Sequence, residues 1–392
     1  MGITHNRTLW LDYLRTTLTV LVVAHHASLA YTTFAAFRPE AYILSTAPVV
    51  DTHRWIGLDI FENFNDVFFM SLMFFISGIF VLPSLQKKGV WLFIRDRFYR
   101  LLIPFAIAVS LLMLIAYYPA YLQAYHRHDL RHYIIDFFTT EQWPVGPPWF
   151  IWLLFTFNLV MALLYPLVMV PLHKFGGWVA RLQNRPIGLW LLWFALTWIL
   201  LVPLALWLGP YRWTGWGPFD FQLSRILLYF GYFTLGVASN SAQEASGLLA
   251  NNTSVNRRWP YMVGLCLLSY AILTIIPPQL EHWVKQEVMA STTGWMIYYV
   301  LYVASCTASC LAFLFAYKAL VRTPRPFLQS LSANAYGIYL VHYVFITWTQ
   351  YLLLPLDLPA IIKCLVSFVL SLALSWGLVA LMRKIQWIQR YL

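Results

Sequence analysis

The sequence predicts an all-α protein, a bundle of about ten helices that cross a membrane. Hydrophobic residues make up 60% of its 392 residues and charged residues only 10%, whereas soluble domains carry about 25% charged residues. Long apolar stretches recur along the chain, and the basic residues fall in short clusters between them. The net charge of +11 therefore fits the orientation of a membrane protein better than the binding of nucleic acid.

Ten stretches are long enough to cross a bilayer, which takes about 20 predominantly apolar residues. They lie at 9–34, 64–85, 101–123, 149–172, 187–208, 221–238, 259–277, 294–317, 332–353 and 358–382. No internal repeat or low-complexity linker separates them. We therefore expect residues 1–392 to form a single domain that contacts membrane lipid.

The distribution of Lys and Arg predicts the orientation of these spans. With ten spans, 17 of the 26 basic residues fall at the termini and in the loops on one side. Six fall in the loops on the other side, and three lie within spans. Because cytoplasmic loops are enriched in Lys and Arg, this asymmetry predicts that both termini are cytoplasmic.

The first predicted span contains three ionisable residues, Arg15, His25 and His26. Ionisable side chains inside a membrane are rare and usually functional. His26 follows Arg15 by eleven residues, close to three helical turns, so the two share a face and lie about 16 Å apart along the axis. His25 is rotated from that face by about 100°, and we expect it to have a structural role.

A second polar cluster, which includes Asp59 and Asp66, precedes and enters the second span. Carboxylates are favoured at the start of a helix, so Asp59 is interpreted as a cap. For Asp66, capping and charge balance with the first helix both remain open. Arg225, His342 and Lys363 also lie within spans, and the sequence assigns them no role.

Six short motifs occur in one order along the chain. They are Leu11-Asp12-Tyr13-Leu14-Arg15 followed by His26, Phe74-Phe75-Ile76-Ser77-Gly78, the basic residues Arg95, Arg97 and Arg100 before Pro104, Pro148-Trp149-Phe150-Ile151-Trp152, Tyr229-Phe230-Gly231 through Gly236, and Gly337-Ile338-Tyr339-Leu340-Val341-His342. In this order they resemble the acyltransferase-3 family of bacterial membrane proteins. Thr16 stands where many members have a glycine, which is more similar to the glucan-modifying succinyltransferase branch.

The resemblance implies a membrane-bound enzyme of the bacterial inner membrane. It implies transfer of an acyl group, of the acetyl or succinyl type, from cytoplasmic acyl-CoA to a hydroxyl of a carbohydrate or glucan at or beyond the membrane. The essential arginine and histidine of the family correspond to Arg15 and His26. No metal cofactor is expected.

The chemistry of these residues suits that reaction. A histidine with a pKa near the working pH is an effective base for a sugar hydroxyl, so we assign His26 as the general base and Arg15 as a contact to the donor. Arg95, Arg97 and Arg100 suit the phosphates of coenzyme A, although positive-inside topology explains them equally well. Ser77 and Trp149 are further candidates for binding the donor, near its reacting carbonyl. Direct transfer and an acyl-enzyme intermediate both remain open.

Two other classes of protein carry buried ionisable residues. A secondary transporter of a glycan, lipid or small solute is the main alternative, although paired broken helices and repeated halves, which are common in transporters, are not found in the sequence. A bis-histidine haem protein that uses His26 and His342 is the other.

Overall fold

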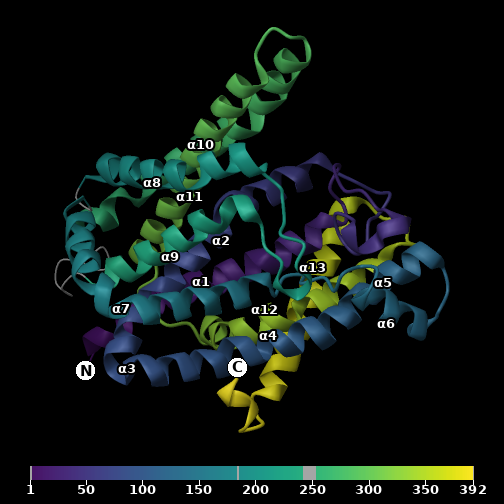
Figure 1. The fold of residues 1–392 in the computed structure, drawn as a ribbon, viewed down its shortest axis with the longest axis horizontal. Helices are drawn as coiled ribbons and strands as arrows, with labels where there is room; N and C mark the ends of the chain where they lie inside the picture. Colours follow the sequence, from purple (N-terminus) through teal and green to yellow (C-terminus); the bar gives the residue numbers. More distant parts are fainter. Residues whose placement is uncertain (1, 183–184, 242–252, 392) are drawn as a thin grey trace.

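The computed structural model describes residues 2–182, 185–241 and 253–391. Within these ranges the chain is helical, with one isolated β-bridge between Trp213 and Gln222 and no strand. The all-α class is therefore confirmed. The long helices, drawn in Figure 1, are α1 (Gly2–Leu29), α2 (Ile56–Ile79), α3 (Val81–Arg97), α5 (Met113–Tyr125), α7 (Trp149–Leu182), α8 (Pro186–Leu208), α9 (Ile226–Ser241), α10 (Thr253–Lys285), α11 (Ser291–Leu320), α12 (Pro326–Leu353) and α13 (Ala360–Met382).

Seven helical segments of the described chain are long and apolar enough to cross a membrane. They are Ile56–Ile79, Val81–Tyr125, Trp149–Leu182, Pro186–Leu208, Arg257–Lys285, Ser291–Leu320 and Ala360–Met382. The other three predicted spans coincide with α1, α9 and α12, and their crossing of the membrane stays a prediction. The chain is a membrane protein with a helical core.

The second predicted span begins too late. The sequence places it at 64–85, but α2 begins at Ile56 and ends at Ile79, and α3 follows after Phe80. The acidic residues Asp59 and Glu62 lower the hydropathy of the first turns of α2, although both are buried. These charged residues therefore made the first turns of α2 look like a loop in the hydropathy pattern, although the fold buries both side chains.

The third predicted span, 101–123, belongs to a longer helical segment. α3 continues through a π-helical turn (Phe98–Leu102), α4 (Ile103–Ile107) and a second π-helical turn (Ala108–Leu112) into α5. Pro104 lies between the two wide turns. Proline has no N–H to donate within a helix, and π-helical turns accommodate such interruptions and often occur near functional sites.

Two glycines bring α2 and α9 into direct backbone contact. A side-chain carbon added at Gly78 would lie 2.0 Å from the carbonyl oxygen of Phe233. One added at Gly236 would lie 2.0 Å from the carbonyl oxygen of Phe75. Small residues allow membrane helices to pack this closely, so the glycines of the second and fifth motifs have a packing role.

Two short elements fold against the outer ends of the long helices. Here the outer ends are those that the distribution of Lys and Arg predicts to face away from the cytoplasm. η1 (Pro39–Leu44) and α6 (Leu130–Phe138) lie in the two long connections before α2 and α7. Asp129 caps α6, because its carboxylate accepts from the backbone N–H of His132 at 3.0 Å. The backbone N–H of Ile43 donates to Glu141 Oε2 at 3.2 Å, so the two connections are joined.

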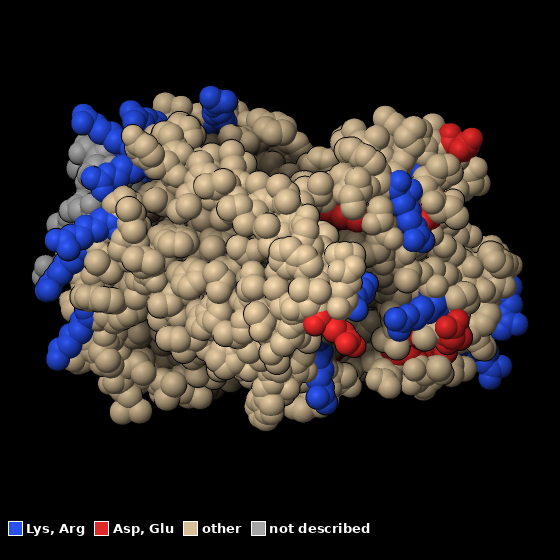
Figure 2. Space-filling model, turned by 90° about the horizontal axis from the view of Figure 1, so that it is seen from above, with Lys and Arg blue, Asp and Glu red and all other residues tan. Residues whose placement is uncertain are grey.

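The charged side chains divide the surface into zones. Figure 2 shows Lys and Arg without visible Asp or Glu at the left end, the end where the N-terminus lies in Figure 1. The middle of that face is almost free of charge, and the right end carries both signs. This pattern agrees with an apolar belt between two polar ends.

Candidate active site

His26 lies on the wall of a cavity of about 550 Å³ inside the helix bundle. We call it the His26 cavity. α1 contributes His25 and His26, α2 contributes Asp66 and Phe69, and the start of α7 contributes Trp149. Residues 141–142 and 144–147, in the connection before α7, also line it. A cavity of this volume is in the range of small-molecule sites, about 300–1,000 Å³.

α12 holds His26 through a second histidine. His342 is fully buried, and its Nε2 lies 3.3 Å from Nδ1 of His26. Nδ1 of His26 also lies 2.8 Å from the carbonyl oxygen of Val22, one turn earlier in α1. On the other side, Nδ1 of His342 lies 2.7 Å from the carbonyl oxygen of Tyr339.

These contacts assign the tautomers of both rings. A carbonyl oxygen only accepts, so Nδ1 of His342 carries a hydrogen and donates to Tyr339, and its Nε2 is an acceptor. Nδ1 of His26 then donates to both Val22 and His342. Nε2 of His26 therefore keeps its lone pair, and it has no hydrogen-bond partner among the described residues. A nitrogen of this kind, on a cavity wall, is a competent base.

Glu141 lines the outer part of the same cavity. Its carboxylate accepts from the backbone of Ile43 at 3.2 Å. Burial raises the pKa of Glu141 to about 7, although the bond from Ile43 opposes the shift. The protonation of this carboxyl group therefore changes near neutral pH.

A second cavity, of about 340 Å³, contains Arg15. We call it the Arg15 cavity. Ser77 of α2, Arg97 of α3 and Arg100 of the following turn line it together with Arg15, and no Asp or Glu does so among the described residues. Tyr391, near the end of the chain, is also on this wall. The site is strongly basic.

The structure separates the three arginines of the third motif. Arg97 and Arg100 line the Arg15 cavity, whereas Arg95 does not and is exposed. The guanidinium of Arg97 lies 4.9 Å from the ring centre of Phe93. Its Nε is buried without a hydrogen-bond partner among the described residues, which is uncommon for a buried donor.

Tyr339 lines both the Arg15 cavity and the His26 cavity. Its hydroxyl donates to the carbonyl oxygen of Pro147, just before α7. Its ring contacts Phe150, at a centroid distance of 5.9 Å. Tyr339 therefore forms the boundary between the two cavities, and the fourth and sixth motifs meet there.

A third cavity, of about 830 Å³, adjoins the His26 cavity. We call it the tyrosine cavity, after Tyr211, Tyr270, Tyr298, Tyr299 and Tyr302 in its wall. His25, Asp66 and Arg225 line both cavities. The three cavities thus form a series along the bundle, from Arg15 past His26 to the tyrosines.

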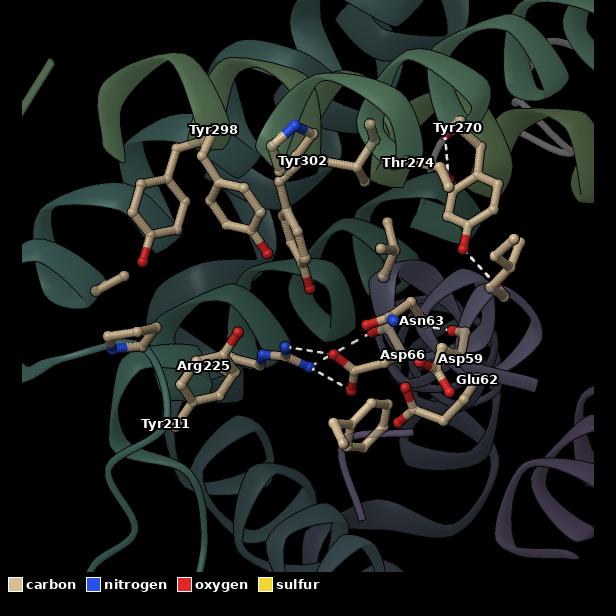
Figure 3. Close-up of a pocket in the computed structure, with 18 of the residues that line it drawn as sticks. Asp59, Glu62, Asn63, Asp66, Tyr211, Arg225, Tyr270, Thr274, Tyr298 and Tyr302 are labelled. Atoms are coloured by element: carbon tan, nitrogen blue, oxygen red, sulfur yellow. Dashed lines mark hydrogen bonds and ion pairs between the residues drawn. The ribbon is translucent and has the colours of Figure 1, made fainter. Parts of the chain in front are cut away.

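The boundary with the tyrosine cavity is an ion pair. Arg225, just before α9, donates to both carboxylate oxygens of Asp66, at 2.8 and 2.6 Å (Figure 3). Asp66 therefore pairs with Arg225 and not with a basic residue of the first helix. His25 faces this region too, and its Nε2 lies 3.7 Å from Glu62 Oε1.

Two further ionisable residues that the sequence analysis singled out, Asp59 and Lys363, also have partners. Asp59 accepts from the backbone N–H of Thr33 at 2.7 Å and from its hydroxyl, so it holds the segment after α1. Lys363 donates to Asp51 at 2.7 Å, and both side chains are at most 1% exposed. The described residues contain no group of three or more His, Cys, Asp or Glu side chains that could hold a metal ion.

A family model described as an acyltransferase domain matches residues 8–380. The chain belongs to the acyltransferase-3 family. No curated protein and no solved structure matches the chain. Family membership supports an enzyme that transfers an acyl group, with an acyl donor and an acceptor as substrates, and it favours this class over a transporter.

The acyltransferase signature is split between two cavities. Arg15, Ser77, Arg97 and Arg100 lie around one, and His26 and Trp149 lie around the other. The haem alternative does not fit the histidines, because Nδ1 of His342 bonds to the carbonyl oxygen of Tyr339 and its Nε2 contacts His26, which leaves neither nitrogen open to an iron.

Sequence reasoning gave no role to His342 and Tyr339 in the site. Both stand in the sixth motif, and that motif was the available signal. Their contacts join α12 to α1 and to the start of α7, and such pairings are not visible in the periodicity of one helix.

Proposed function

We propose that the protein transfers an acetyl- or succinyl-type acyl group from cytoplasmic acyl-CoA to a hydroxyl of a carbohydrate or glucan. The observation that carries this proposal is the His26–His342 pair. It leaves Nε2 of His26 as a free acceptor on a cavity. That cavity shares Tyr339 with the basic Arg15 cavity, so a base and a site for an anionic donor adjoin.

The reaction follows from this arrangement. Nε2 of His26 accepts the proton of the acceptor hydroxyl, and the oxygen attacks the thioester carbonyl. The tetrahedral intermediate collapses as its carbon–sulfur bond breaks, and the coenzyme A thiolate takes the proton from His26. Trp149 lines the same cavity, and its indole N–H is the candidate donor to the developing oxyanion.

The basic cavity supports the binding of coenzyme A. Arg15, Arg97 and Arg100 meet the phosphates, and Ser77 lies beside them. Planar guanidinium groups bind phosphate through paired, charge-assisted hydrogen bonds. The pantetheine arm then passes Tyr339 and carries the thioester toward His26.

We infer that residues 1–392 form one domain of the bacterial inner membrane with both termini in the cytoplasm. The family match over residues 8–380 and a hydrophobic core that runs from Trp10 to Val379 support one domain. The excess of Lys and Arg on one side supports the orientation, as does Tyr391 beside Arg15. Thr16 is the reason to place the acceptor among glucans.

The test is acyl transfer by the purified protein. The protein in detergent is incubated with labelled acetyl-CoA or succinyl-CoA and a glucan, and released coenzyme A and labelled glucan are measured. His26→Ala should lower kcat by about 10²–10⁴-fold, the usual contribution of a general base. His173→Ala, at an exposed histidine of α7, is the matched control. Full activity of the His26 variant would contradict the proposal.

A further inference from the structure

The tyrosine cavity has a wall of mixed chemistry. Figure 3 shows Tyr298 and Tyr302, from α11, on one side and the Arg225–Asp66 pair opposite them. Asp59 and Glu62 of α2 lie beside Asp66. Aromatic rings thus face carboxyl groups across a space of about 830 Å³.

This combination matches the surface of a sugar. A pyranose ring has faces of C–H groups and an edge of hydroxyls. The electron-rich face of an aromatic ring attracts the electropositive edge of a neighbouring group, and C–H groups of sugars are of this kind. Carboxylate oxygens accept hydrogen bonds from the sugar hydroxyls, and tyrosine hydroxyls can both accept from them and donate to them.

The cavity also has hydrogen-bonding groups without partners. The hydroxyl of Tyr299 is buried, the residue is 3% exposed, and no described residue bonds to it. Nδ1 of His25 is in the same state, on a residue that is 8% exposed. A buried polar group without a hydrogen-bond partner destabilises the structure that contains it. Both residues line the tyrosine cavity, where a hydroxyl-rich ligand offers hydrogen-bond donors and acceptors.

The charges of the wall disfavour an anionic ligand. Three carboxyl groups, of Asp59, Glu62 and Asp66, line the cavity with one guanidinium, that of Arg225. Both ends of that guanidinium bind Asp66. The phosphates of coenzyme A or of a phospholipid headgroup would meet a net negative wall, whereas a neutral, polyhydroxylated chain would not.

We propose that the tyrosine cavity binds an oligosaccharide and holds the sugar units next to the one that is acylated. This inference rests on the proposed function, because it assigns the acceptor to a place. The shared wall of His25, Asp66 and Arg225 lets one chain extend from the tyrosine cavity to His26. The rings of Tyr298 and Tyr302 stack on its sugar units.

The experiment measures binding of linear gluco-oligosaccharides, α-linked and β-linked, to the protein in detergent by calorimetry. Tyr298→Ala combined with Tyr302→Ala should raise the Kd for the bound oligosaccharide about tenfold, as loss of two aromatic contacts predicts. Tyr298→Phe combined with Tyr302→Phe keeps the rings and should raise it less. Tyr261→Ala, at an exposed tyrosine of α10, is the control. The melting temperature of each sample in detergent checks that the fold is intact.

The outcomes separate this inference from the proposed function. If oligosaccharide binds, the alanine variant weakens it and no acyl transfer occurs, the site stands and the proposed function fails. If transfer occurs and the alanine variant keeps the oligosaccharide Kd, the site is wrong and the function stands. Failure of every oligosaccharide of the panel to bind, or equal loss in the Tyr261 control, overturns the inference.

Discussion

The Arg15 cavity and the tyrosine cavity both adjoin the His26 cavity, and they have opposite charge. The first presents Arg15, Arg97 and Arg100 without a carboxylate among its described lining residues. The second presents three carboxyl groups, one guanidinium and a group of tyrosines. If the proposed function holds, this difference means that the helix bundle separates the two substrates by charge. The basic end suits a phosphorylated donor, and the acidic, aromatic end suits a neutral acceptor.

The largest expected effect is a loss of stability when the ion pair between the tyrosine and His26 cavities is broken. Asp66→Ala leaves the guanidinium of Arg225, whose side chain is 9% exposed, without its partner. Breaking a buried ion pair costs about 3–5 kcal/mol, and the lower end applies because Asp66 faces the cavity. Thermal unfolding in detergent measures the loss. Glu281→Ala breaks the exposed pair with Lys285 and should leave stability almost unchanged; equal losses in the two variants would contradict the assignment.

The second largest effect concerns the base between the two ends. His342→Ala removes one of the two acceptors that hold Nδ1 of His26 and leaves only the carbonyl oxygen of Val22, so the imidazole is less firmly held in its productive position. Misplacement of a reacting group by about 1 Å costs on the order of 10²-fold in rate. We expect this loss in kcat with an unchanged KM for acyl-CoA, and a changed pH profile of kcat. A variant with the wild-type kcat and pH profile would remove His342 from the mechanism.

The basic end is tested by two arginines two residues apart. Arg97→Ala should raise the KM for acyl-CoA about tenfold, since a hydrogen bond to a charged group contributes about 1.5–3 kcal/mol. Arg95→Ala should leave it unchanged, because Arg95 is outside the cavity. Initial rates over a range of acetyl-CoA or succinyl-CoA concentrations give the KM of each variant. The same KM in both variants would leave these residues only a topological role.

The smallest effect should appear at the outer rim of the His26 cavity. The pKa of Glu141 is about 7 in the folded protein and near 4.5 in the unfolded chain. The folded state then binds more protons between these values, so its stability falls as pH rises from about 4.5 to 7. Melting temperatures across this range should fall less for Glu141→Gln than for the wild type. Parallel curves would contradict the role of this carboxyl group.

The sequence predicted the fold class because composition and span length dictate it. It also predicted the Arg15–His26 face, which follows from helical periodicity alone. The partner of His26 lies 316 residues away, and no local pattern contains that contact. His26 was thus recognisable from the sequence as a candidate base, whereas its contact with His342 was not.

The three arginines show a different limit. They were interpreted as one cluster in a loop, but Arg95 and Arg97 lie in α3 and Arg100 in the turn that continues it. Residues three apart share a face of a helix and residues two apart do not. Arg97 and Arg100 therefore line the Arg15 cavity together while Arg95 does not. The spacing carried this information once the segment was known to be helical.

The central claim is that donor and acceptor reach His26 from opposite sides of the membrane. It is tested most directly in proteoliposomes of uniform orientation with a glucan trapped inside. Labelled acetyl-CoA or succinyl-CoA is added outside, and acylated glucan is measured in the lumen. With the Arg15 end outward, we predict labelled luminal glucan that is lost in His26→Ala. Product that forms only when donor and glucan are on the same side would contradict the account.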